Sequence, residues 1–193
     1  MTHSNSLQIV SFYVVLFFLT FSLFGQNNVQ LNEFNSARLT KNKRLMLTLG
    51  GWSAVNISTG IVGSLTTSGT TQHFHQMNSL WNTVNLSLSL GGLLRYNKDT
   101  SKSFNLIESM RIQLKTERIF LINSIVDIGY IGAGTFLHNR SLIGGTNAEL
   151  EKGFGNSLIM QGAFLLLFDT AAYFIHKKNR LKLLEPIVNY KRL

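Results

Sequence analysis

Fifty consecutive residues, 45–94, contain no Lys, Arg, Asp or Glu. A soluble domain carries a charged residue about once in every four positions, so an interval of this length is typical of a chain that lies in lipid. The interval breaks once, at residues 66–71, where the sequence Thr-Thr-Ser-Gly-Thr-Thr predicts a turn. We therefore predict a membrane hairpin with spans at about residues 45–65 and 74–94.

The two predicted spans share a sequence motif. The pattern W-x-x-V-N-x-S-x-x-x-x-G begins at Trp52 and again at Trp81, and all five defined positions match. This match predicts an internal repeat, in which one helical unit is used twice. The third apolar run retains Val126-Asp127 and Gly134 from the motif, and the fourth retains only an acid, Asp169.

Two further apolar runs follow, at about residues 119–138 and 156–176, and each is interrupted by one aspartate. Together with the hairpin they predict an all-α integral membrane protein, a four-helix bundle of two hairpins that forms a single domain over residues 26–193. Before the third run, apolar residues recur at helical spacing within a basic segment. This spacing predicts an amphipathic interfacial helix at about residues 101–117, with an ordinary helical linker as the alternative.

The amino-terminal apolar run, residues 7–24, has two interpretations. Its Phe-Gly-Gln ending is typical of a bacterial cleavage region, whereas the leading segment Met1–Ser6 has no Lys or Arg, which is poor for a signal peptide. Residues 1–25 are therefore either a signal peptide or an N-terminal transmembrane helix, a fifth span.

The 18 Lys and Arg residues are unevenly placed around the predicted spans. Four precede the first span, six lie between the second and third, and six follow the fourth, which leaves Arg140 and Lys152 on the other side. The positive-inside rule then predicts an inner-membrane protein with a cytoplasmic carboxyl terminus, which agrees with a retained fifth span. Because these charges lie between apolar spans, the net charge of +9 does not indicate nucleic acid. The expected partners are the lipid bilayer and another membrane protein or a second copy.

One carboxamide or carboxylate lies near the midpoint of each predicted span. These candidate polar-core residues are Asn56, Asn85, Asp127 and Asp169. An ionised Asp at the bilayer centre costs about 2.5–3.5 kcal/mol on insertion scales, so we expect the four side chains to face inward and to bond one another. We also expect at least one of the two acids to be protonated at neutral pH. Such a ring is either a site for a proton or small polar solute, or a clasp that fixes helix register.

Helical spacing around this ring identifies candidate ligand-wall or flanking residues, namely Trp52, Trp81, His75, Asn78, Asn123 and His138. The two Trp residues lie deeper than an interfacial belt, so they are either packing residues or the wall of a planar or cationic ligand. The two His residues lie at span ends, so we expect no haem, no metal and no other cofactor. The chain has no Cys and no Walker, dinucleotide-glycine or serine-hydrolase motif, so no catalytic residue is predicted.

Three segments carry a resemblance to a known family: GGWSAVN at residues 50–56, F-H-x-M-N with W-N-x-V-N at residues 74–85, and QGAF at residues 161–164 followed by Asp169. They resemble an uncharacterised family of small multi-pass bacterial membrane proteins over roughly residues 34–184, whose members often begin with a signal-like segment. The resemblance implies the architecture and no activity. The function expected from the sequence is either binding or conduction of a proton or small polar solute by a buried polar core, or a non-catalytic role as a membrane scaffold or assembly subunit.

Overall fold

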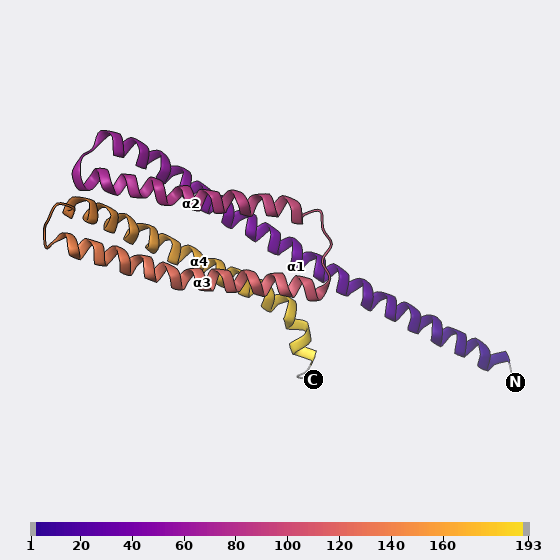
Figure 1. Cartoon of the computed structure of the whole chain (residues 1–193). Helices are drawn as coiled ribbons and strands as arrows, with labels where there is room; N and C mark the ends of the chain where they lie inside the picture. Colours follow the sequence, from indigo (N-terminus) through magenta and orange to yellow (C-terminus); the bar gives the residue numbers. More distant parts are fainter. Residues whose placement is uncertain (1–2, 191–193) are drawn as a thin grey trace.

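The computed structural model describes the backbone of residues 3–190 and the side chains of residues 29–185. Four helices make up this part of the chain (Figure 1): α1 (His3–Thr66), α2 (Gly69–Asp99), α3 (Leu106–Ser141) and α4 (Ala148–Tyr190). The predicted all-α fold is confirmed. The apolar run at residues 7–24, interpreted as a signal peptide or fifth span, lies outside the residues whose side chains are described.

The helices form two antiparallel hairpins that pack side by side (Figure 1). Helix α1 pairs with α2 and α3 pairs with α4, and the hairpins meet chiefly where α2 packs on α4. The turn predicted at residues 66–71 is confirmed, because α1 ends at Thr66 and α2 begins at Gly69. Gly69 has φ +59°, a left-handed conformation in which a residue with a side chain would be strained. The turn and the α3–α4 loop lie at the same end of the bundle.

Helix α3 begins well before the predicted third span. Residues 106–117 are its first turns and continue directly into the span. Asn105 caps this helix, since its side chain accepts a hydrogen bond from the backbone N–H of Glu108 at 2.9 Å. In these turns Ile107 is exposed, whereas Ser109 and Gln113 are buried against the other helices. The position of this segment at a membrane interface stays a prediction.

The bundle buries polar side chains and exposes apolar ones. In α2 every buried residue is polar, and exposed apolar residues such as Leu80, Val84 and Leu88 occupy the opposite face. Helices α1, α3 and α4 are long and apolar enough to cross a membrane. Helix α2, predicted as the remaining span, is not among them, because its buried stripe of Asn and Ser lowers its mean hydropathy.

An apolar core completes the packing on one side of the polar interior. It consists of residues from α1, α3 and α4, namely Leu45, Leu49, Phe120, Leu165, Phe168 and Ala172. Each of these helices also carries polar residues on the same buried face, so apolar and polar layers alternate along the bundle.

Corresponding positions of the predicted repeat lie in matching environments. Asn56 and Asn85 are both buried. A Cβ on Gly63 or on Gly92 would overlap a side chain of the partner helix, so each glycine permits close approach of α1 and α2. The repeat itself stays a prediction.

Candidate functional site: a cleft between α2 and α3

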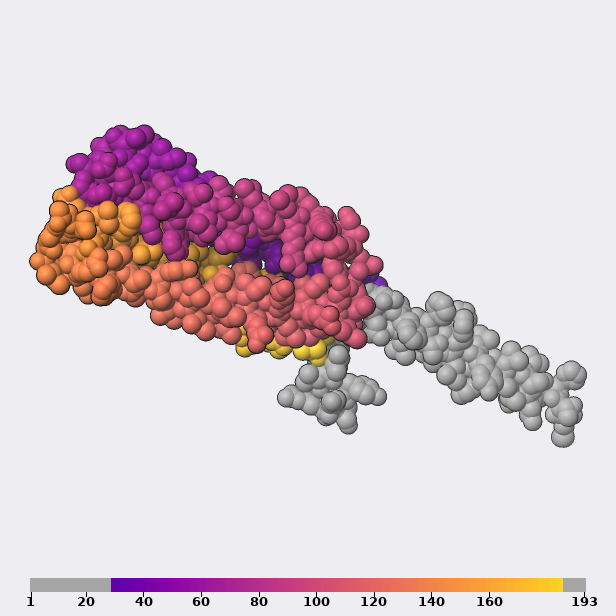
Figure 2. All heavy atoms as spheres, in the orientation of Figure 1, coloured from indigo at the N-terminus to yellow at the C-terminus, as the bar shows by residue number. Residues whose placement is uncertain are grey.

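A cleft runs along the bundle between α2 and α3, whose backbones do not pack against each other. Its central cavity has a volume of about 340 Å³, which lies within the range of about 300–1,000 Å³ found for small-molecule sites. Figure 2 shows the cleft as a furrow between the two helices. The rim includes Val84 and Leu88 of α2 and Ile119 and Val126 of α3, all of them exposed. The cleft therefore opens on the apolar exterior.

Four polar side chains line the cleft: Asn85, Asp127 and Asp169 are buried on its floor, and Asn123 is exposed. Asp127 and Asp169 are close enough for their carboxyl groups to interact, and Asn123 lies beside Asp169. Two neighbouring carboxyl groups away from water can share one proton, because two ionised carboxylates would repel each other. The structure thus brings together three of the four predicted polar-core residues, and the predicted flanking residue Asn123 lies beside them.

Aromatic side chains form much of the cleft wall. Trp81 meets Tyr130 edge to face, with ring centroids 4.6 Å apart. Three buried polar atoms of the cleft have no hydrogen-bond partner among the described residues: Trp81 Nε1, Asn85 Nδ2 and Asp127 Oδ2. A buried polar atom left unpaired costs about 1–3 kcal/mol. Three such atoms around one cavity therefore favour a bound polar group that satisfies them.

Asn56, the fourth predicted polar-core residue, lies outside the cleft in a network of amides. Asn78 Nδ2 donates to Asn56 Oδ1 at 2.9 Å, Gln161 Nε2 donates to Asn78 Oδ1, and Trp52 Nε1 donates to Gln161 Oε1 at 3.0 Å. Because α1 and α2 are antiparallel, Asn56 is level with Asn78. Asn78 lies two helical turns, about 10 Å, from Asn85 along α2. The single ring expected from the span midpoints is therefore two separate clusters.

The other predicted flanking residues lie away from the cleft. The His75 ring packs against α1, and His138 Nδ1 lies 2.7 Å from Asn156 Oδ1. Trp52 stacks on Phe164 with ring centroids 3.8 Å apart, which makes it a packing residue. Within residues 29–185, no group of three or more His, Cys, Asp or Glu side chains is placed to hold a metal ion.

Sequence reasoning missed Tyr130 of the cleft wall and Gln161 of the amide network. Gln161 is fully buried and joins α4 to Trp52 of α1 and to Asn78 of α2. A signal for it was present, since Gln161 interrupts an apolar run and lies two turns before Asp169 on the same face of α4. Helical spacing traced back from Asp169 would have found it.

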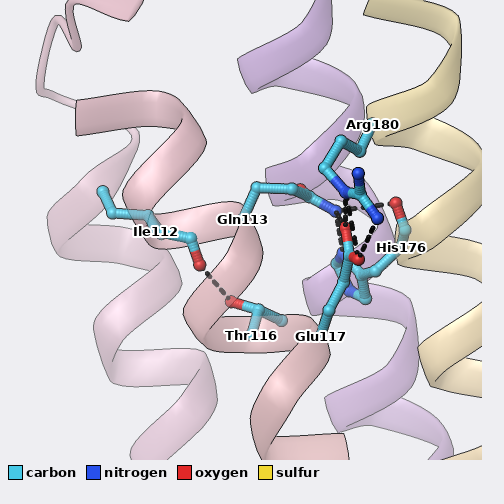
Figure 3. A network of polar contacts seen from close by, with 6 residues as sticks. All are labelled: Ile112, Gln113, Thr116, Glu117, His176 and Arg180. Carbon is cyan, nitrogen blue, oxygen red and sulfur yellow. Dashed lines mark hydrogen bonds and ion pairs between the residues drawn. The ribbon is translucent and has the colours of Figure 1, made fainter. Parts of the chain in front are cut away.

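A further polar cluster lies between α3 and α4, near the end of the bundle that carries most of the basic residues (Figure 3). Arg180 donates from Nε and Nη2 to the two carboxylate oxygens of Glu117, each at 3.0 Å. Gln113 Nε2 donates to Glu117 at 3.1 Å and to the backbone carbonyl of His176 at 2.7 Å. Figure 3 shows these side chains converging between α3 and α4. The hydrogen bonds to Glu117 raise the pKa of Arg180 above its ordinary value.

Comparison with known proteins identifies a family. Neither a curated protein nor a solved structure matches the chain. A family model matches residues 48–170, a narrower range than the resemblance in the sequence indicated. This range includes the whole floor of the cleft and the amide network, and it excludes Arg180. The chain belongs to the family of unknown function DUF6992.

Proposed function

We propose that the protein is a multi-pass membrane protein that binds a small solute, together with a proton, in the cleft between α2 and α3. The observation that carries this proposal is the chemistry of the cleft floor. Asp127 and Asp169 lie together there, and Asn85 Nδ2 and Asp127 Oδ2 have no hydrogen-bond partner among the described residues. A cavity of ligand size that ends on such groups is the arrangement expected of a binding site.

The apolar exterior supports a location in the membrane. Exposed apolar residues lie on the outer face of α2, as they do on α1, α3 and α4, the three helices that are long and apolar enough to cross a membrane. The exposed Thr83 and Ser87 of α2 donate their hydroxyl hydrogens to carbonyl groups of their own helix, so this face is compatible with lipid. We therefore propose that α2 is a fourth span. The distribution of Lys and Arg supports an inner-membrane orientation with a cytoplasmic carboxyl terminus.

The unpaired atoms favour a binding site over a scaffold. A polar clasp that only fixes helix register needs donors and acceptors that satisfy one another. In the amide network, Asn56, Asn78 and Gln161 bond one another, and one buried atom beside them, Asn82 Oδ1, is without a partner in the described part of the chain. The cleft fits the description of a clasp less well, because three of its buried polar atoms are without partners in the described part of the chain. We assign the amide network to helix packing and the cleft to ligand binding.

Infrared spectroscopy of the protein in lipid bilayers at neutral pH tests the shared proton. We expect a carbonyl stretch from a protonated carboxyl group in the wild type. The band should shift in Asp127→Asn and in Asp169→Asn and disappear in the double variant. The matched control is Glu151→Gln, because Glu151 pairs with Arg140 at the bundle surface and its replacement should leave the band unchanged. A wild-type spectrum with carboxylate bands alone would refute the proton site.

A further inference from the structure

We infer that the ligand of this cleft is an amphiphile with an uncharged hydroxyl head, which enters sideways from the lipid between α2 and α3. This inference rests on the proposed binding function and adds the class of ligand and its route. It follows from two independent features. One is the set of unpaired atoms on the cleft floor and wall, and the other is the separation of the two helix backbones, which only side chains such as Trp81 and Tyr130 bridge.

The three unpaired atoms, two donors and one acceptor, correspond to the hydrogen bonds that one hydroxyl group can make. Trp81 Nε1 and Asn85 Nδ2 are donors, and Asp127 Oδ2 is an acceptor. A hydroxyl group accepts two hydrogen bonds and donates one, so it pairs with all three atoms. An ammonium head has no acceptor and leaves both donors unpaired. A carboxylate head has no donor and adds negative charge beside two acidic residues.

The seam between α2 and α3 provides the route and the place for the apolar part of the ligand. The exposed rim residues Val84 and Val126 belong to the helices on either side of it. A second cavity of about 490 Å³ continues along the same seam and shares Leu88 and Ile119 with the first. An alkyl chain whose head lies on the cleft floor can therefore extend out between the two helices or along the seam past Leu88 and Ile119, short of the far end of the second cavity, where Arg38, Arg95 and Asp99 line it.

The two Trp residues of the chain make the inference testable by fluorescence, because one lines the cleft and the other does not. Trp52→Phe leaves Trp81 as the reporter in the cleft, and Trp81→Phe leaves Trp52 in the amide network. The probes are bromododecanol, bromododecanoate and bromododecylammonium, since bromine quenches a nearby indole and the three differ only in the head. Each is titrated into vesicles of a zwitterionic phospholipid that contain one variant.

We expect bromododecanol to quench Trp81 in a saturable manner that unbrominated dodecanol reverses. The other two probes should quench only in proportion to their concentration in the bilayer, and Trp52 should show no saturable quenching by any of them. Asn85→Leu, which removes one donor and keeps an apolar side chain of similar size, should weaken saturable binding by about tenfold, the loss of one hydrogen bond. Circular dichroism of each variant confirms that the helices remain.

Closing the seam tests the route. The chain has no Cys, so Val84→Cys and Val126→Cys together provide a unique pair for a reducible bifunctional thiosulfonate reagent. Cross-linking should abolish saturable quenching by bromododecanol, and reduction should restore it. The reagent on the Val84→Cys variant alone should leave binding in place. If the cross-linked protein binds as well as the reduced protein, lateral entry is wrong.

The outcomes separate this inference from the proposed function. Saturable quenching by the ammonium or carboxylate probe in place of the alcohol would overturn the hydroxyl assignment and leave a binding site in the cleft. Failure of all three probes to saturate would overturn the inference as a whole. The proton site of Asp127 and Asp169 is then judged separately by the infrared spectra, which need no ligand.

Discussion

Removing the charge of Glu117 should destabilise the bundle far more than removing the charge of Glu151, although each acid pairs with one arginine. Glu117 accepts hydrogen bonds from both Arg180 and Gln113 and keeps only 6% of its side chain exposed. Breaking a buried ion pair by removing one partner costs about 3–5 kcal/mol, and because Arg180 keeps 21% of its side chain exposed we expect the lower end, about 3 kcal/mol, for Glu117→Gln.

The assay is unfolding by SDS in mixed micelles, followed by circular dichroism. Glu151→Gln is the matched control, because its partner Arg140 keeps 50% of its side chain exposed and surface pairs contribute little. A double-mutant cycle with Arg180→Gln isolates the pair. The double variant should lose less free energy than the sum of the two single variants, by about 1–3 kcal/mol. Equal losses for Glu117→Gln and Glu151→Gln would refute the reasoning, since burial would then make no difference.

Two further predictions concern helix packing and pH. Gly60→Ala should lower the free energy of unfolding by about 1 kcal/mol net, because a Cβ there would lie 2.8 Å from the His75 backbone oxygen. At Gly129 a Cβ meets nothing within 4 Å, so Gly129→Ala should raise the free energy of unfolding by up to about 1 kcal/mol through helix propensity. Equal effects of the two variants in SDS unfolding would contradict the close approach of α1 and α2 at Gly60. The hydrogen bond from Arg140 lowers the pKa of Glu151, so the stabilisation from this pair is present at neutral pH and is lost as the pH falls through the lowered pKa. Carbon NMR titration should therefore show the Glu151 pKa rising toward its ordinary value in Arg140→Gln, and an unchanged titration would show that the pair does not form.

The helices were predictable from the sequence because their signals are local. An uncharged interval of fifty residues with one polar break leaves little choice but a hairpin, and the turn lies where the break indicates. Helical spacing also placed Asn123 and Asp127 on one face of α3, and both line the cleft. Helical spacing further indicated a helix at about residues 101–117, and α3 begins within this range, at Leu106.

The arrangement of the site depends on how the helices pair, which no local pattern encodes. Span midpoints suggested that Asn56 and Asn85 lie at one depth, but the antiparallel register of α1 and α2 sets Asn56 beside Asn78. The cleft itself arises because the two hairpins meet through α2 and α4, and the backbones of α2 and α3 do not pack against each other. The packing of one hairpin on the other therefore determines which of the buried polar residues belong to the ligand site.

The measurement that tests the central claim most directly is a spin-label scan along the exposed face of α2 in lipid bilayers. Single cysteines replace Leu80, Val84 and Leu88 in a chain that has no other Cys, and each label is examined for collisions with oxygen, which dissolves in lipid, and with an aqueous nickel chelate. If the bundle lies in the membrane with its polar residues inside, all three labels should be accessible to oxygen and protected from nickel. Labels open to nickel along this whole face would place α2 in water and contradict the account.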